Sequence, residues 1–227
     1  MQVTLIQFTP EPELTIAAAA RLCYSPVSAT EIRQRLSPKQ VENLLNRVIP
    51  SGHHSVLEHA SFTLAIDGLS RAASHQLVRH RLASYSQQSQ RYVSLKTPEY
   101  VTPPSIAQRS DLREAFDAAV LAAFRLYDQL QAAGVPAEDA RFVLPNACTT
   151  RLVMTMNFRE LMHACSIRLC THAQWEIREI FAAAREEVRK VAPFLAGYLH
   201  IKCETLGYCD EPETCGIRPL KVEVLGQ

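Results

Sequence analysis

The chain is organised around the stretch Arg79–Arg91, which reads RHRLASYSQQSQR. Arg79, His80 and Arg81 stand in a row, and a polar run of hydroxyls and amides leads from them to Ser89 and Arg91. Arginine side chains bind phosphate or carboxylate through paired hydrogen bonds, and hydroxyls and amides can read the edge of a heterocycle. The stretch therefore suits a phosphorylated, aromatic ligand. A solvated basic helix end is the alternative, because cations are favoured at helix C-termini.

The residues just before this stretch predict a helix that runs from an N-cap at Ser70 toward Arg81. On such a helix Gln76, Arg79 and His80 lie at i, i+3 and i+4 and share a face. Arg81 points away from its neighbours. One helix end could then serve two ligands side by side.

Hydrophobic periodicity predicts the other helices and strands. Strands are expected at Val3–Phe8, at Ser61–Ile66, which Asp67-Gly68 would end, and at Arg151–Met156. Helices are expected at Pro12–Tyr24, from Pro38 to Val48, at Ser110–Ala133, at Ala137–Phe142, after Asn157, and within His172–Leu199. The apolar stripe of the long helix, from Leu112 to Tyr127, is expected to be core. No G-x-G-x-x-G opens a helix after a strand, so a Rossmann fold is not supported.

The helix after Asn157 carries cationic side chains on two faces. Arg159 and His163 lie at i and i+4, while Arg168 lies half a revolution away from Arg159. We expect Arg159 and His163 to face one ligand and Arg168 to face another. The short helix before Pro145 is expected to bring up Arg141.

A cluster of polar, mostly titratable residues spans His53–His59, which reads HHSVLEH. Its spacing matches no common zinc helix motif such as H-E-x-x-H, so no metal site is predicted. A turn that supplies Ser55 to a cofactor is favoured instead. Glu58 and His59 are alternatively hydrogen-bonded structural groups, as buried polar residues usually are.

Composition sets bounds on the class of protein. The chain has 227 residues and a formal net charge of +1, from 24 Lys+Arg against 23 Asp+Glu. That balance argues against binding of long nucleic acid, for which a strongly basic domain is expected. No apolar run approaches the ~18 residues that cross a membrane. Seven cysteines without a C-x2-C pair, and a first segment that reads as a strand rather than a signal peptide, indicate the reducing cytoplasm.

Beyond these bounds, the spacing of Arg79, His80, Arg81 and Ser89 resembles the RHR-x7-S signature of flavin-dependent thymidylate synthases. Other blocks that look like this family are His53–His59, Ser61–Thr63, Ser70–Arg91, Arg141–Asn146 (RFVLPN), Thr155–Glu160 (TMNFRE) and Arg168–Ile177 (RLCTHAQWEI). These ordered blocks are spread over most of residues 45–200, which makes the resemblance specific.

The resemblance implies an α+β fold, a mixed sheet with long helices. It implies one catalytic domain over residues 1–200, followed by a peripheral tail over 201–227. The implied enzyme converts dUMP to dTMP, with methylenetetrahydrofolate as carbon donor, FAD as hydride carrier and NADPH as reductant. The resemblance also implies a homotetramer whose sites are shared between subunits.

The resemblance further implies which residues form the sites. Arg168 matches the arginine that activates the uracil ring. The dUMP contacts match Gln76, Arg79, Gln87, Gln88, Ser89, Gln90, Arg91, Arg141 and Arg168. The FAD contacts match Ser55, Arg79, His80, Arg81, Gln87, Asn157, Phe158, Arg159 and His163. Gln87 departs from family members that have glutamate there, so a role that needs a carboxylate is in doubt.

Three alternatives stay open at this point. Cys170, close to Arg168 in the sequence, is the rival nucleophile, because a nearby cation favours a thiolate; the resemblance implies no enzymic thiolate. Ser89 could act as a covalent nucleophile, but without a paired base a binding hydroxyl is favoured. A non-enzymatic RNA- or nucleotide-binding module that uses Arg79–Arg91 is the alternative function.

Overall fold

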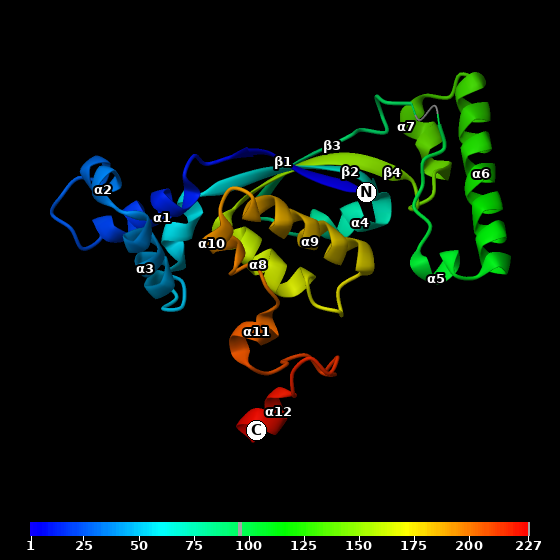
Figure 1. The fold of residues 1–227 in the computed structure, drawn as a ribbon. Coiled ribbons are helices and arrows are strands. Elements are labelled where there is room, and N and C mark those ends of the chain that lie inside the picture. The colour runs from blue at the N-terminus through cyan, green and yellow to red at the C-terminus, as the bar shows by residue number, and fades with distance from the viewer. Residues whose placement is uncertain (95–96, 227) are drawn as a thin grey trace. The chain divides into compact units, whose positions relative to one another are not determined.

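The computed structural model describes residues 1–94 and 97–226 (Figure 1). Within them the strands form one antiparallel sheet in the order β1–β2–β4–β3. The strands are β1 (Gln2–Phe8), β2 (Ser61–Ser70), β3 (Ala83–Gln87) and β4 (Thr149–Asn157). The predicted α+β class is confirmed, with strands that are antiparallel rather than mixed in direction.

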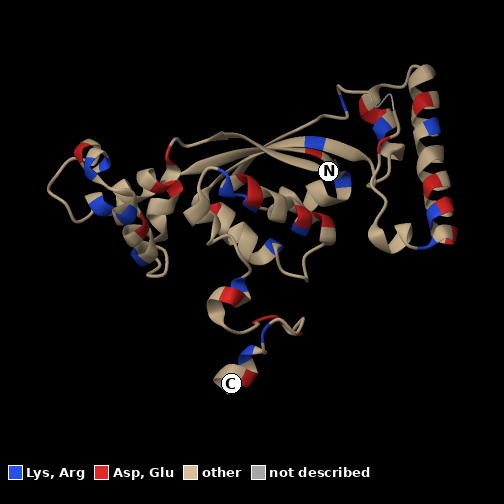
Figure 2. Ribbon diagram, viewed as in Figure 1, with Lys and Arg blue, Asp and Glu red and all other residues tan. Residues whose placement is uncertain are grey.

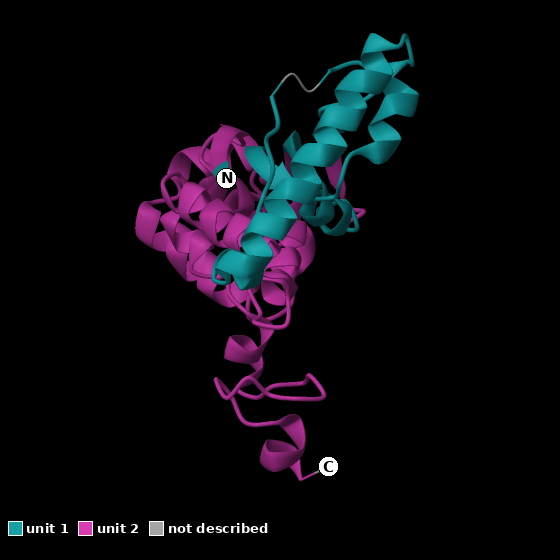
Figure 3. Ribbon diagram, turned by 90° about the vertical axis from the view of Figure 1, so that its right-hand side faces the viewer, with its two compact units in different colours: residues 1–2, 65–79, 85–153 teal, residues 3–64, 80–84, 154–227 magenta. Residues whose placement is uncertain are grey.

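The chain divides into two compact units, coloured separately in Figure 3. Unit 1 comprises residues 1–2, 65–79 and 85–153, and unit 2 comprises residues 3–64, 80–84 and 154–226 of the described chain. The predicted boundary between a catalytic domain and a tail at residue 200 stays a prediction.

Unit 2 is mostly helical. Its helices are α1 (Pro12–Leu22), α2 (Ala29–Arg35), α3 (Pro38–Val48), η1 (His54–His59), α8 (Phe158–Arg168), α9 (Trp175–Arg189), α10 (Pro193–Ala196), α11 (Lys202–Leu206) and α12 (Lys221–Leu225). Helix α1 packs against α2, α3 and η1, while α8 packs against η1 and α9. The core of this unit includes fully buried Leu45, Leu57, Phe158 and Phe181.

Polar caps set where the helices of unit 2 begin. Helix α3 starts at Pro38 as predicted, and Ser37 and Gln40 form a capping box at that end. The Asn157 side chain accepts a hydrogen bond from the Glu160 backbone N–H at 2.9 Å and starts α8. Helix α2 was not predicted, because Ile32 is its one buried residue and no apolar stripe marks it.

Unit 1 contains α4 (Arg71–Leu77), α5 (Pro104–Ala107), α6 (Ser110–Ala132), α7 (Ala137–Ala140) and η2 (Arg141–Val143). Helix α6 buries Val120, Phe124 and Tyr127, but Leu112 at its start is 39% exposed, so the core stripe is shorter than predicted. Acidic and basic residues are interspersed along α6 (Figure 2). In the part of the chain that the structure describes, no helix is long and apolar enough to span a membrane.

Two predictions in unit 1 and its flanks were wrong. Strand β2 does not end at Asp67-Gly68 but continues to Ser70, and within it Gly68 adopts a φ of +77° that few other residues tolerate. Ser70 does cap α4, but the helix ends at Leu77, whose carbonyl accepts a hydrogen bond from the Tyr85 hydroxyl at 2.8 Å. Arg79 and His80 therefore lie beyond the helix, and the shared face with Gln76 does not exist. Within the polar run that follows, Ala83–Gln87 pairs as β3.

Candidate functional site

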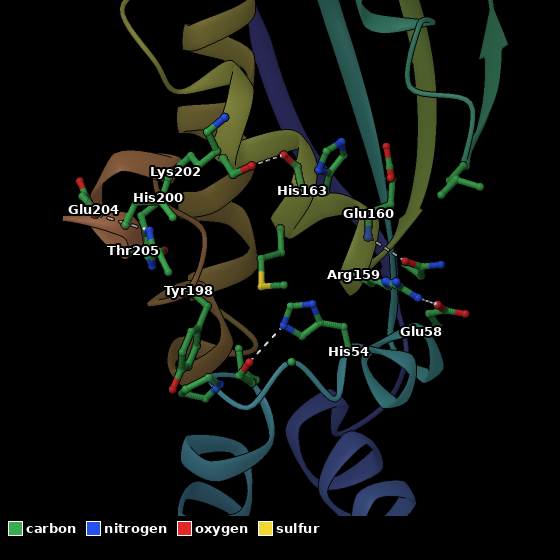
Figure 4. Close-up of a pocket in the computed structure, with 18 residues that line it drawn as sticks. His54, Glu58, Arg159, Glu160, His163, Tyr198, His200, Lys202, Glu204 and Thr205 are labelled. Carbon is green, nitrogen blue, oxygen red and sulfur yellow. Dashed lines mark hydrogen bonds and ion pairs between the residues drawn. The ribbon is translucent and has the colours of Figure 1, made fainter. Parts of the chain in front are cut away.

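A cavity of about 930 Å³ lies within unit 2 (Figure 4). One wall comes from η1 and α8, and the facing wall comes from the segment after α10. The lining combines apolar side chains, such as Leu82, Met162 and Leu206, with a polar set: His54, Glu58, Asn157, Arg159, Glu160, His163, Tyr198, His200, Lys202 and Glu204. A volume of this size is at the upper end of the ~300–1,000 Å³ range of ligand sites.

The α8 wall follows directly from the cap at Asn157. With the helix started there, Arg159 and His163 stand one turn apart and both line the cavity, as predicted from their i, i+4 spacing. The Arg159 guanidinium is paired with the Glu58 carboxylate at 2.6 Å, and both side chains stay about half exposed. Arg159 therefore faces the cavity with a carboxylate partner that a stronger anionic ligand would have to displace.

The facing wall was not predicted from the sequence. Tyr198 and His200 line it together with Lys202, Glu204 and Thr205 of α11 (Figure 4). The Tyr198 hydroxyl donates to the Asn46 side chain at 3.1 Å, while Lys202 is paired with Asp210. This segment belongs to no motif, and residues from 201 onward are predicted to form a peripheral tail. Its one signal was a ring-bearing and basic run at residues 198–202.

The predicted FAD residues of unit 2 have different surroundings. Asn157, Arg159 and His163 line the cavity, whereas Ser55 and Arg81 are exposed outside its lining. Phe158 is fully buried, with its ring 6.3 Å from that of Phe62, and its backbone N–H donates to the Ala60 carbonyl at 2.7 Å. Arg79 and Gln87, also in the predicted FAD set, belong to unit 1.

His80 is buried at the centre of a polar network. Its Nδ1 lies 3.0 Å from Oε1 of Glu160, and both side chains are 6% exposed. Its Nε2 lies 2.9 Å from Nε of Arg168, which belongs to the last turn of α8. The ring also packs against His163 and Phe181. Both ring nitrogens of this predicted FAD contact are therefore engaged by protein groups.

The donors in this network determine its protonation state. Arginine has N–H donors and no acceptor, so Nε2 of His80 must be the unprotonated nitrogen that accepts from Arg168. The ring proton is then on Nδ1, and Glu160 accepts it. Burial lowers the pKa of His80 and the Arg168 charge lowers it further, against the opposing effect of the Glu160 hydrogen bond. The neutral tautomer is thus the one that this environment stabilises.

Unit 1 gathers arginines around one acidic residue. The Arg91 guanidinium is paired with the Glu138 carboxylate at 2.7 Å, and Nε of Arg141 donates to the Glu138 carbonyl at 3.0 Å. Arg71, which is not among the predicted site residues, interacts electrostatically with Arg141; burial and the Arg141 charge both lower its pKa. Cations that repel one another in this way fit an anion such as phosphate. The sequence feature that could have pointed to Arg71 is its position directly after the predicted N-cap, Ser70.

The other predicted dUMP residues of unit 1 lie at the end of β3 and beside α4. The Gln87 amide donates to the Thr150 hydroxyl at 3.3 Å, and the Gln88 N–H donates to the Arg151 carbonyl at 2.9 Å. The Ser89 hydroxyl accepts from the Arg91 N–H at 3.1 Å, which shapes the turn that presents Arg91. The remaining members of this set are Gln76 and Gln90, both partly exposed, and Arg79, which is exposed. Arg168, the last of the set, belongs to unit 2.

The cysteines are all free thiols in the structure. Burial raises the pKa of Cys165 to about 12 and that of Cys148 to about 11. Cys170, the rival nucleophile, is partly buried just beyond the end of α8. The two fully buried thiols are thus poor sources of a thiolate at neutral pH.

Comparison with known proteins adds to this geometry. Residues 4–194 match the family model described as thymidylate synthase complementing protein. A flavin-dependent thymidylate synthase of Geobacter sulfurreducens is 49% identical over 95% of this chain and 94% of its own length. One of Pyrococcus abyssi is 42% identical over 94% and 91%. The crystal structure of a UMP/dUMP methylase, PolB from Streptomyces cacaoi, bound with 5-Br dUMP, has a TM-score of 0.79 at 23% identity. The match covers 87% of this chain and 93% of that one, and shows a common fold.

Proposed function

Since the chain belongs to the family of flavin-dependent thymidylate synthases, we propose that it methylates dUMP to dTMP and that its own side chains carry the roles set out below. Family membership makes FAD the cofactor, with NADPH and methylenetetrahydrofolate as co-substrates. The observation that supports the proposal most is the match over residues 4–194, which takes in both the arginine cluster and the α8 wall of the cavity. It also weighs against the alternative of a non-enzymatic RNA-binding module.

The cavity of unit 2 fits a cofactor that carries phosphates and planar rings. Arg159 supplies positive charge from α8 and Lys202 from the facing wall, and His163 and His200 add ring nitrogens that can form hydrogen bonds. Asn157 stays occupied as the cap of α8, so its part is to set the position of Arg159. When bound, FAD supplies hydride transfer, with electrons taken from NADPH. The protein orients the reactants and excludes water.

The arginine cluster of unit 1 suits the phosphate of dUMP. Arg91 and Arg141 are held by Glu138, and Arg71 adds a third cation near Arg141. In this proposal Ser89 shapes the turn before Arg91, and its hydroxyl donates a hydrogen bond to the ligand. Gln76 and Gln87 contact the base through their side-chain amides. An uncharged amide at Gln87 can bond either a donor or an acceptor edge.

Arg168 is proposed as the residue that activates the uracil. A guanidinium beside the ring imide favours its N-deprotonated form and stabilises negative charge that develops on the ring carbonyls. Ser89 acts as a binding hydroxyl in this scheme, and no cysteine adds to the ring. The raised pKa values of Cys148 and Cys165 support that part of the proposal.

The proposed assembly is a homotetramer in the cytoplasm, with sites built by more than one subunit. A shared site does not require unit 1 and unit 2 of one chain to face the same ligand. Seven free cysteines favour the reducing compartment.

The experiment is an absorbance spectrum followed by turnover. We expect the purified protein to be yellow with non-covalent FAD, and to form dTMP only when dUMP, methylenetetrahydrofolate and NADPH are all present. A protein that stays flavin-free after incubation with FAD would contradict the proposal. If it instead binds RNA with a steep dependence on salt, the alternative module is supported.

A further inference from the structure

Glu160, His80 and Arg168 form a chain of hydrogen bonds inside unit 2. Glu160 stands two turns before Arg168 on α8, and His80, from the segment 80–84, bridges them with one bond on each ring nitrogen. Each bond is between 2.9 and 3.0 Å, and the His80 and Glu160 side chains are nearly excluded from solvent. Such buried, fully bonded polar groups hold their partners in one orientation.

We propose that His80 is a positioning residue for Arg168: Glu160 holds its proton on Nδ1, and its bare Nε2 accepts the Nε–H of Arg168, which orients the guanidinium for its reaction partner. This inference rests on the proposed role of Arg168. It assigns to His80 a part played through Arg168 rather than through the flavin.

The geometry explains why the guanidinium is held at Nε. With Nε–H bonded to His80, the two terminal nitrogens at the other end of the planar group keep their N–H donors for a ligand. A lysine at this position could place a charge but not a planar pair of donors. The rotation of the arginine about its last bonds is therefore set by a ring that is itself clamped by Glu160.

The arrangement also predicts a pH response. The charged and titratable groups that face His80 are Glu160, His163 and Arg168, all from α8, while α9 contributes the apolar Phe181. Protonation of His80 would place an N–H on Nε2, opposite the Nε–H of Arg168. The bond would break and two cations would repel one another, so Arg168 would lose its orientation.

The test combines activity with a direct probe of the tautomer. We compare the wild type with His80→Ala, Glu160→Gln, Arg168→Lys and the double variant His80→Ala/Arg168→Lys. Phe181→Leu is the matched control, because Phe181 packs on the His80 ring without a polar contact. The readouts are kcat and KM for dUMP, thermal unfolding, and the ring ¹⁵N shifts of His80, assigned by their absence in His80→Ala.

We expect His80→Ala to lower kcat by roughly 10- to 100-fold with a smaller change in KM. When Arg168 is already lysine, adding His80→Ala should lower kcat by less than about a further 3-fold, because the two residues act as a unit. Phe181→Leu should lower the unfolding temperature and leave kcat within about 2-fold. The ¹⁵N shifts should report the Nδ1–H tautomer.

Three results would overturn the inference. The first is an Nε2–H tautomer of His80, and the second is a wild-type kcat in His80→Ala. The third is a double variant whose decrease in kcat equals the product of the decreases in His80→Ala and Arg168→Lys. If His80→Ala does not fold, Glu160→Gln decides. A lowered kcat with weakened Nδ1–H character supports the inference, and an unchanged kcat refutes it. If Arg168→Lys alone turns over at the wild-type rate while the Nδ1–H tautomer is observed, the proposed role of Arg168 fails, although the network itself is real.

Discussion

Substitution of the cysteines distinguishes a flavin-dependent mechanism from one in which an enzymic thiolate adds to uracil. Cys165 lies on α8 and is fully buried, with a pKa raised to about 12. At pH 8 a thiol of that pKa is ionised in about one molecule in 10,000, and the Cys148 thiol, at about 11, in about one in 1,000. Neither thiol can supply a nucleophile at a useful concentration.

We therefore predict that Cys165→Ala keeps dTMP formation within about 2-fold of the wild type at 25 °C. Removing a buried sulfur should cost about 1 kcal/mol of unfolding free energy, or roughly 2–4 °C in Tm for a chain of this length. The assay is chromatographic quantification of dTMP, paired with a thermal melt. Loss of stability without loss of turnover is the expected signature of a packing role.

Cys170 is the stricter case, because it is partly exposed and follows Arg168 closely. Cys170→Ala should also retain turnover, with exposed Cys23→Ala as the matched control. The reasoning is refuted if Cys170→Ala abolishes dTMP formation while FAD and dUMP still bind. That result would identify a thiolate mechanism.

Four further outcomes follow from the contacts of α8. Arg168→Lys should retain FAD and its reduction by NADPH, whereas oxidation of the reduced flavin by dUMP with methylenetetrahydrofolate should slow at least ~100-fold in stopped flow; a near wild-type rate would disprove the assignment. Arg159→Ala should weaken FAD retention on dialysis, while Glu58→Ala, which frees the arginine, should not; equal losses would show that only the ion pair matters. Asn157→Ala should cost about 1 kcal/mol in urea unfolding through loss of the α8 cap, and no change would mean that the cap is redundant. The unfolding free energy should fall as pH drops below about 6.5, because His80 accepts a proton in the unfolded chain but resists it when buried in the folded one. If His80→Gln shows the same dependence of unfolding free energy on pH, that dependence comes from other groups.

Local signals in the sequence determined much of the scaffold. Strand β1, helix α6, the cap at Asn157 and the capping box at Ser37 follow from alternation, an apolar stripe and short-range hydrogen bonds. The i, i+4 spacing of Arg159 and His163 likewise determined that both would share one face. These features depend on residues within a few positions of one another, so a linear pattern is enough to specify them.

The end of α4 and the network around His80 were decided only by tertiary structure. Helical spacing predicted one face for Gln76, Arg79 and His80, but the Tyr85 hydroxyl and the pairing of β3 end the helix first. Glu160 and Arg168 then reach His80 from positions 80 and 88 residues away in the chain. The cavity wall after α10 likewise comes from a segment without a motif. Contacts between residues so distant in sequence leave no periodic trace, because what selects them is the burial of polar groups that must find partners.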